Sequence, residues 1–181
     1  MTKVAFLDRD GVINKEINYL HKVEDFEYTK DCIKGLLQLI KLGFQLVIVT
    51  NQAGIAKGIF SLNDYKFLTK WMLSDLKKKG IRILDCIYCP HHPDGVIKEY
   101  AKRCACRKPA PGMINYAIEK YNIDAGSSIL IGDKISDIQS GKNAGIYQLF
   151  LVSTGHSLNQ DIYENNKIYS SLLEVANYLE K

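Results

Sequence analysis

Residues 4–12 read VAFLDRDGV, an apolar run that leads directly into two aspartates. The uninterrupted apolarity of residues 4–7 favours a strand that is covered on both faces of a sheet. Asp8 and Asp10 are two positions apart, so at the end of an extended strand their side chains point to the same side. Gly11 allows the chain to turn sharply behind them. The stretch therefore predicts a buried strand whose carboxyl end carries a pair of acids.

Further apolar runs alternate with stretches of helical spacing along the rest of the chain. The runs, interpreted as strands, are Phe44–Val49, Ile83–Tyr88, Ser128–Ile131 and Tyr147–Val152. The helical stretches are Asp31–Leu42, Leu62–Lys79, Pro111–Tyr121, Ile135–Ala144 and Ser170–Leu179. Strands that alternate with helices predict parallel strands joined by right-handed crossovers. We therefore expect an α/β fold built on a doubly wound, Rossmann-like parallel sheet.

Polar residues follow the predicted strands at their carboxyl ends, where sheets of this kind bind ligands. The first four runs are followed in turn by Asp8 and Asp10, by Thr50 and Asn51, by Cys89 and His91, and by Asp133 and Lys134. Ordinary loop residues are the alternative explanation, but they would not supply a chemically coherent set at every strand end. We expect these side chains to converge on one cleft.

The acids of this set favour magnesium and phosphate chemistry. Asp8, Asp10 and Asp133 would form a hard oxygen site of the kind that Mg²⁺ prefers. Without a cation the three carboxylates would repel one another and any phosphate ester. The hydroxyl of Thr50 and the ammonium of Lys108 could hold phosphoryl oxygens during transfer. The sequence thus predicts a phosphoryl-transfer site.

A second group of residues has the spacing of a zinc site. Cys89 and His91 form one short pair, and Cys104 and Cys106 form another after a loop of about a dozen residues. Thiolate and imidazole ligands select Zn²⁺ over Mg²⁺, and four protein ligands indicate a structural site. His92 competes with His91 for the imidazole position. The two other cysteines, Cys32 and Cys86, fall in helical and strand-like stretches and are interpreted as small buried side chains.

Size and composition bound the remaining possibilities. A chain of 181 residues suits one domain, 1–181, and its net charge of +4 is too modest to indicate a nucleic-acid surface. The N-terminal apolar run is too short for a signal peptide, and no run is long enough to cross a membrane. We expect a cytoplasmic protein with no membrane or nucleic-acid partner. Because no exposed apolar stripe is left over, we expect a monomer.

Taken together, the motifs resemble those of haloacid dehalogenase (HAD) superfamily phosphohydrolases. The resemblance rests on Asp8-Arg-Asp10-Gly-Val, Thr50-Asn51, Lys108-Pro109 and Gly132-Asp133-Lys134-Ile-Ser-Asp137, in that order. It implies strand order 3-2-1-4-5, no separate cap domain, Asp8 as a nucleophile that forms an aspartyl-phosphate, and Asp10 as its acid–base partner. It further implies that Mg²⁺ is bound by Asp8, Asp133 and the main-chain carbonyl of Asp10. Asp137 would act from behind these ligands, through water or by orienting Lys134.

A narrower resemblance comes from residues 50–56 (TNQAGIA), residues 104–113 (CACRKPAPGM) and the zinc-binding loop at about residues 89–106. These segments are similar to those of the heptose-bisphosphate phosphatase family, whose nearest relatives are histidinol-phosphate phosphatases. The resemblance implies a small phosphorylated sugar as substrate, with removal of the 7-phosphate of a heptose 1,7-bisphosphate in making precursors of lipopolysaccharide or other surface glycans. The implied substrate-binding residues are Glu16, Ile17, Asn18, Tyr19, Asn51, Gln52, Ala53, Arg107 and Lys134. Asn18 stands where the family often has glycine, and Asn tolerates the left-handed backbone that glycine favours.

Three alternatives remain open at this point. Histidinol phosphate is the alternative substrate. The insertions after the first and third predicted strands are short, so the cleft should be open and could admit varied phosphate esters. A polynucleotide 3′-phosphatase would need a long basic surface. A zinc-containing nucleic-acid-binding module would need basic and aromatic residues on one face, whereas here the aromatic residues are scattered.

Overall fold

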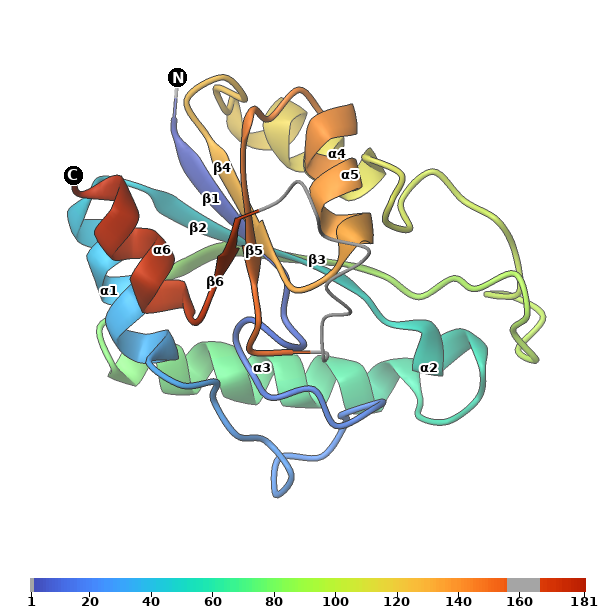
Figure 1. Cartoon of the computed structure of the whole chain (residues 1–181). Helices are drawn as coiled ribbons and strands as arrows, with labels where there is room; N and C mark the ends of the chain where they lie inside the picture. The colour runs from blue at the N-terminus through green and yellow to red at the C-terminus, as the bar shows by residue number, and fades with distance from the viewer. Residues whose placement is uncertain (1, 156–166) are drawn as a thin grey trace.

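A computed structural model describes residues 2–155 and 167–181, and its centre is one parallel sheet (Figure 1). The sheet has six strands in the order β3-β2-β1-β4-β5-β6, and every neighbouring pair is parallel. The strands are β1 (Val4–Leu7), β2 (Gln45–Asn51), β3 (Ile83–Cys89), β4 (Ile129–Gly132), β5 (Gln148–Val152) and β6 (Ile168–Tyr169). The predicted order of the first five strands is confirmed. The sixth was not predicted, because two residues are too few to produce a recognisable pattern.

The strands are buried on both faces, as their continuous apolarity predicted. In β1, Ala5 and Leu7 pack into one core, whereas Val4 and Phe6 pack into a second core on the opposite face. The neighbouring β2 alternates in the same way between the two cores. Alternate burial of consecutive apolar residues requires helices on both faces, which is the doubly wound arrangement.

Six helices are found in the described residues, and those that cover the sheet divide between its faces (Figure 1). They are α1 (Cys32–Lys41), α2 (Ala53–Ala56), α3 (Leu62–Lys78), α4 (Gly112–Tyr121), α5 (Ile135–Asn143) and α6 (Leu172–Leu179). The apolar sides of α1, α3 and α6 fill the first core, and those of α4 and α5 fill the second. Ser61 caps α3 by accepting a bond from Asp64 N–H, while the Asp64 carboxylate accepts one from Ser61 N–H.

Element boundaries agree with the sequence prediction to within one or two residues, except at α2. This single turn follows β2 directly and was not predicted, because four residues are too few to show a helical period. None of the helices over residues 2–155 and 167–181 combines the length and apolarity needed to cross a bilayer.

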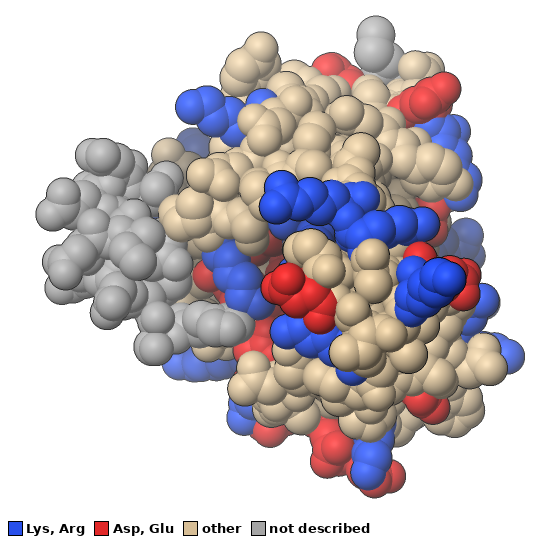
Figure 2. Space-filling view, turned by 90° about the vertical axis from the view of Figure 1, so that its right-hand side faces the viewer, with Lys and Arg blue, Asp and Glu red and all other residues tan. Residues whose placement is uncertain are grey.

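Two segments extend from the carboxyl ends of the strands. Residues 8–31 follow β1 and return along the α3 side, and residues 90–111 follow β3 and project beyond α2 (Figure 1). On the side of the molecule where the second segment projects, Lys and Arg side chains gather across the middle of the face, with acidic residues among them (Figure 2). These two segments supply about half of the residues that line the cleft described next.

Candidate active site and metal centre

A cleft of about 370 Å³ lies at the carboxyl ends of the strands. Its lining comes from the segments that follow β1, β2, β3 and β4: Asp8, Asp10, Glu16, Asn18, Tyr19, Thr50, Asn51, Gln52, Ala53, Gly54, Arg107, Lys108, Lys134, Ser136 and Asp137. Cys89 and His91, which were expected in this cleft, are not part of its lining and belong to a separate cluster with Cys104 and Cys106, while Asp133 is buried next to Asp8 and Asp137. Of the predicted substrate-binding residues, Ile17 is the one that does not line the cleft, and its side chain is exposed. Residues that are as much as 129 positions apart therefore share a single polar cavity.

Buried charges of opposite sign meet at the floor of the cleft. The ammonium of Lys108 lies 2.9 Å from Oδ1 of Asp8 and 2.6 Å from Oδ1 of Asp137, and it donates to the carbonyl of Val49 at 2.9 Å. Burial alone would lower the pKa of Lys108, but the Asp137 and Asp8 carboxylates raise it above the ordinary value. Lys108 is therefore a permanent cation beside the predicted nucleophile.

Asp133 lies deeper still, in a cradle formed by main chain. Its side chain is fully buried, and a Cβ placed on Gly11 would come within 2.4 Å of Oδ2 of Asp133. Gly11 also has φ +90°, a conformation that strains any other residue. The turn behind the two acids of the first motif thus closes directly on the acid of the fourth.

Three carboxylates come together in this region. Asp8, Asp133 and Asp137 each offer one oxygen, and these oxygens lie within 4.8 Å of one another. Burial is the main cause that raises the pKa of Asp8 to about 6, and the neighbouring acids Asp137 and Asp10 add to it against the lowering effect of Lys108. Burial, then Asp8, raises the pKa of Asp133 to about 8. Such mutual repulsion in a dry pocket is what a divalent cation relieves, so the donor set fits Mg²⁺.

Asp10 is held differently, by hydrogen bonds and an ion pair. The guanidinium of Arg9 donates to both carboxylate oxygens through Nε and Nη2, at 2.9–3.2 Å. Asn14 Nδ2 and Gln52 Nε2 each donate to the same carboxylate at 2.9 Å. Burial alone would raise the pKa of Asp10, but Arg9 and these donors hold it below the ordinary value. Asp10 is thus a fixed carboxylate whose oxygens are oriented from three sides.

Arg9 and Asn14 were not predicted as part of the site. The sequence did contain a signal for Arg9, because it is a basic residue between two acids. When acids are buried at the end of a strand, a nearby cation is expected to be buried with them. Arg9 is 1% exposed, and its guanidinium lies 5.8 Å from the ring centre of Tyr65. Asn14 gave no signal, because only the turn at Gly11 brings it back towards Asp10.

The residues after β2 point in different directions. Thr50 is buried, and its hydroxyl accepts a bond from Gln52 Nε2 at 3.0 Å. The side-chain amide of Asn51 pairs with the main chain of Lys108. Two residues that were predicted to contact substrate therefore direct their amides at other residues of the site.

The predicted substrate loop, residues 16–19, is held across the cleft from both sides. The Glu16 carboxylate accepts a bond from Asn18 N–H at 2.8 Å and pairs with the ammonium of Lys134 at 3.3 Å. On the other side, the ammonium of Lys57 donates to the Tyr19 hydroxyl at 3.0 Å. Asn18 and Tyr19 have φ of 56° and 59°, so the left-handed backbone that was expected at Asn18 is present and extends to its neighbour.

Asp137 has two partners in the structure. Its Oδ1 pairs with Lys108, as described above, and its Oδ2 accepts a bond from Lys134 N–H at 3.0 Å, which caps α5. The predicted orientation of Lys134 by Asp137 thus involves the main chain of Lys134, and the side-chain partner of Asp137 is Lys108.

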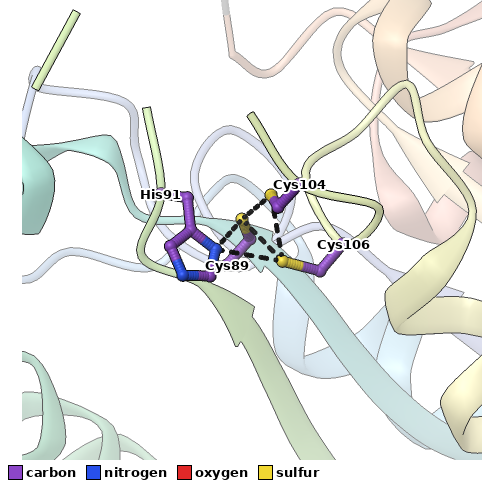
Figure 3. A group of neighbouring side chains, drawn as sticks. All are labelled: Cys89, His91, Cys104 and Cys106. Atoms are coloured by element: carbon purple, nitrogen blue, oxygen red, sulfur yellow. Dashed lines mark hydrogen bonds between the residues drawn. The ribbon is translucent and has the colours of Figure 1, made fainter. Parts of the chain in front are cut away.

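The four predicted zinc ligands form a compact cluster (Figure 3). Cys89 at the end of β3, His91, Cys104 and Cys106 each offer an atom within 4.8 Å of the others. Their sulfur atoms are 3.0–3.5 Å apart, and His91 Nδ1 lies 3.3 Å from the Cys106 sulfur. His92 lies outside the cluster, and its Nδ1 accepts a bond from Asp94 N–H. Three thiols and one imidazole at these separations fit a tetrahedral zinc site with Zn–S distances of about 2.3 Å.

The chain is similar to known proteins over nearly its whole length. Residues 105–175 match the HAD-hydrolase-like family. The chain is 56% identical to a D-glycero-α-D-manno-heptose-1,7-bisphosphate 7-phosphatase of Photorhabdus laumondii, over 98% of this chain and 97% of the relative. It is 38% identical to the D-glycero-β-D-manno-heptose-1,7-bisphosphate 7-phosphatase of Escherichia coli, over 97% of this chain and 93% of the relative.

A solved structure is similar over the same length. The D,D-heptose 1,7-bisphosphate phosphatase of B. bronchiseptica, complexed with magnesium and phosphate, superposes with a TM-score of 0.82 at 28% identity. The match covers 99% of this chain and 98% of that one. Sequence and fold therefore agree along the whole chain, which belongs to the heptose-1,7-bisphosphate 7-phosphatase family of HAD-type hydrolases.

Proposed function

We propose that this chain is a Mg²⁺-dependent phosphatase that removes the 7-phosphate from D-glycero-D-manno-heptose 1,7-bisphosphate. The observation that carries the chemistry is the buried Asp8 carboxylate, which lies 2.9 Å from the Lys108 ammonium and shares a group of carboxylate oxygens with Asp133 and Asp137. The substrate is supported by full-length identity to enzymes named for it. The product would feed the synthesis of heptose precursors for lipopolysaccharide or other surface glycans.

Asp8 and Asp10 divide the reaction between them. An oxygen of Asp8 attacks phosphorus while the bond from phosphorus to the sugar oxygen breaks, which leaves an aspartyl-phosphate. Asp10 is ionised in the free protein, so it would take the proton of the phosphate monoester as the substrate binds, give that proton to the departing sugar oxygen, and then take one from the water that hydrolyses the intermediate. The orientation of Asp10 by three donors supports this role, since a general acid–base must be held within reach of both oxygens in turn.

Mg²⁺ would be held by Asp8, Asp133 and the main-chain carbonyl of Asp10, and when bound it would neutralise negative charge on the phosphoryl oxygens. Thr50 and Lys108 would hold those oxygens from the protein side. Asp137 keeps Lys108 in place and adds a third carboxylate to the same pocket.

The rest of the cleft would bind the sugar. Glu16, Asn18, Tyr19 and Ala53 line it beside Arg107 and Lys134. Two cations at the mouth suit the second phosphate of a bisphosphate, and the fork of Arg107 can bind it through two parallel bonds. Ile17 would contribute only its main chain, because its side chain faces away from the cleft lining.

Cys89, His91, Cys104 and Cys106 would bind a structural Zn²⁺ within residues 89–106. The role of the metal would be to fold a loop that has few apolar contacts of its own, and the fixed position of Arg107 supports this. The Arg107 guanidinium donates to the main-chain carbonyl of His91 at 3.2 Å. Arg107, a predicted substrate-binding residue, is therefore hydrogen-bonded to a predicted zinc ligand.

The α anomer of the heptose is the proposed substrate. Photorhabdus laumondii has one relative named for the α anomer, at 56% identity to this chain, and another named for the β anomer, at 42%. Identity to the first exceeds identity to the second over nearly the same length of chain. Histidinol phosphate, the alternative from the sequence, is less consistent with these relatives.

The test is release of phosphate from four substrates, with Mg²⁺ present: the α and β anomers of the heptose 1,7-bisphosphate, histidinol phosphate and p-nitrophenyl phosphate. We expect the highest kcat/KM for the α anomer, and a loss of at least about 1,000-fold in kcat for Asp8→Asn. A preference for histidinol phosphate would overturn the substrate. Turnover that survives in Asp8→Asn would overturn the covalent mechanism.

A further inference from the structure

Asn51 is the last residue of β2, and its side-chain amide forms a reciprocal pair of hydrogen bonds with the main chain of Lys108. Asn51 Nδ2 donates to the Lys108 carbonyl at 3.1 Å, and Lys108 N–H donates to Asn51 Oδ1 at 3.1 Å. This is the pattern by which neighbouring strands pair, here made by one side chain across 57 residues of sequence. Both polar atoms of the amide are therefore engaged with the protein.

Lys108 needs such support because of where it lies. It belongs to residues 90–111, which connect β3 to α4 without a helix or strand of their own. Main-chain groups in such a segment obtain no regular partners from secondary structure. Asn51 supplies a partner to both main-chain groups of Lys108 at once.

The tip of the Lys108 side chain is fixed from the same strand. The carbonyl of Val49, two residues before Asn51 in β2, accepts a bond from the ammonium at 2.9 Å. Asp8 and Asp137 take the remaining directions, so all three donors of the ammonium have a partner. β2 thus holds Lys108 at its main chain, through Asn51, and at its tip, through Val49.

From this geometry we propose that Asn51 is a positioning residue, which fixes Lys108 against Asp8, and that it is not a contact of the sugar. The proposal rests on the phosphatase chemistry proposed above and does not depend on which phosphate ester is the substrate. A shift of about 1 Å in a group that orients the reacting atoms can cost about 100-fold in rate. Loss of the Asn51 amide should therefore reduce kcat, while KM changes little.

The substrate distinguishes a positioning role from a sugar contact. In Asn51→Ala we expect kcat to fall about 10- to 100-fold by the same factor for the heptose bisphosphate and for p-nitrophenyl phosphate, which has no sugar. Asn115→Ala is the matched control, because Asn115 is exposed on α4 and its loss should leave both activities unchanged. A rise in KM for the heptose bisphosphate alone, with normal turnover of p-nitrophenyl phosphate, would overturn the proposal.

A double-mutant cycle shows whether Asn51 acts through Lys108. If it does, Asn51→Ala should cost little further activity in a Lys108→Ala background, because the group that it positions is already absent. Independent, multiplicative losses would contradict the proposal. Asn51→Asp guards against misfolding, since it keeps the shape and the Oδ1 acceptor for Lys108 N–H. It replaces the Nδ2 donor with an oxygen that repels the Lys108 carbonyl, so it too should lower kcat for both substrates.

A readout that needs no activity separates this proposal from the proposed function. Hydrogen exchange of the Lys108 N–H should be faster in Asn51→Ala than in wild type, because its acceptor is gone. Unchanged exchange would sink the positioning role even in an active enzyme. An inactive wild-type protein with faster exchange in the variant would instead refute the phosphatase chemistry and leave the contact between Asn51 and Lys108 intact.

Discussion

The ammonium of Lys108 lies 2.6 Å from Oδ1 of Asp137, and the two side chains are 3% and 2% exposed. This buried pair joins the third and fourth motifs of the sequence, which come from opposite sides of β1. Because Asp8 shares the same cation, the charge of Asp137 helps to set the position of Lys108 relative to the proposed nucleophile. The pair thus lies within the proposed catalytic site.

Asp137→Asn should weaken the hold on the Lys108 ammonium without removing the side chain that fills this position. An amide keeps the size of the side chain but removes one of the two negative charges that balance Lys108. We expect kcat to fall about 10- to 100-fold and the Mg²⁺ concentration for half-maximal activity to rise. Steady-state assays across a Mg²⁺ titration measure both. Asp94→Asn is the control, since the Asp94 side chain is 87% exposed and should be neutral. An unchanged Mg²⁺ dependence would contradict a role for Asp137 near the metal.

Stability in the absence of Mg²⁺ should decrease as pH rises. The pKa of Asp133 is raised from 3.8 to about 8, mainly by burial. The folded state therefore binds a proton at Asp133 that the unfolded state has already lost between these values, so stability is highest at the acid end of this window and falls towards its upper end. Asp8, with its pKa raised to about 6, contributes with the same sign over the lower half.

Mg²⁺ should reverse this loss, because it binds the deprotonated carboxylates. The increase in unfolding temperature on addition of Mg²⁺ should be larger at about pH 8.5 than at about pH 5. Thermal unfolding of the protein after dialysis into Mg²⁺-free buffer measures the effect. No chelator is used in the dialysis, because a chelator would also remove metal from a zinc site. In Asp133→Asn both the pH slope and the Mg²⁺ effect should shrink. A Mg²⁺ effect that is equal at both pH values would exclude these carboxylates as its origin.

Gly11→Ala should destabilise the protein and abolish activity. A Cβ at Gly11 would meet Oδ2 of Asp133 at 2.4 Å, and the left-handed backbone adds strain of about 1–2 kcal/mol. Gly80→Ala is a matched control, because Gly80 also has a positive φ of +81° but no atom within 4 Å of the added Cβ. Denaturant unfolding should show a loss for Gly80→Ala that is close to the backbone strain alone, and a clearly larger loss for Gly11→Ala. Equal losses would mean that the approach to Asp133 has no cost.

Zinc content should depend on Cys104 and not on Cys86. Wild-type protein should contain about one zinc per chain by elemental analysis, and Cys104→Ser should lose most of it together with thermal stability. Cys86→Ser should keep its zinc, because Cys86 lies outside the cluster of thiols and points towards Tyr65. Full zinc content in Cys104→Ser would exclude the proposed ligand set.

Much of the fold followed from pattern alone. The five longer strands and the longer helices were predicted within one or two residues, since burial on both faces leaves continuous apolar runs and helices leave a period near 3.6. β6 and α2 were missed, because each spans only about one period of its pattern, which is too short for a repeat to be recognised. The four phosphoryl-transfer motifs and the thiol spacing were equally visible, since each is local in sequence.

Local sequence patterns specify which residue types stand at the end of each strand. Which of these side chains meet depends on the packing of the folded chain. The side chain of Asn51 was predicted to contact substrate, but in the structure it bonds to the main chain of Lys108. His91, and not His92, joins the thiol cluster, and Arg9 forms an ion pair with Asp10. The physical reason is that a strand's periodicity fixes the direction of each side chain relative to its own backbone. The partner it reaches depends on how other segments of the chain pack against that backbone, as for Asn51 and Lys108, which are 57 residues apart, and no local pattern records this.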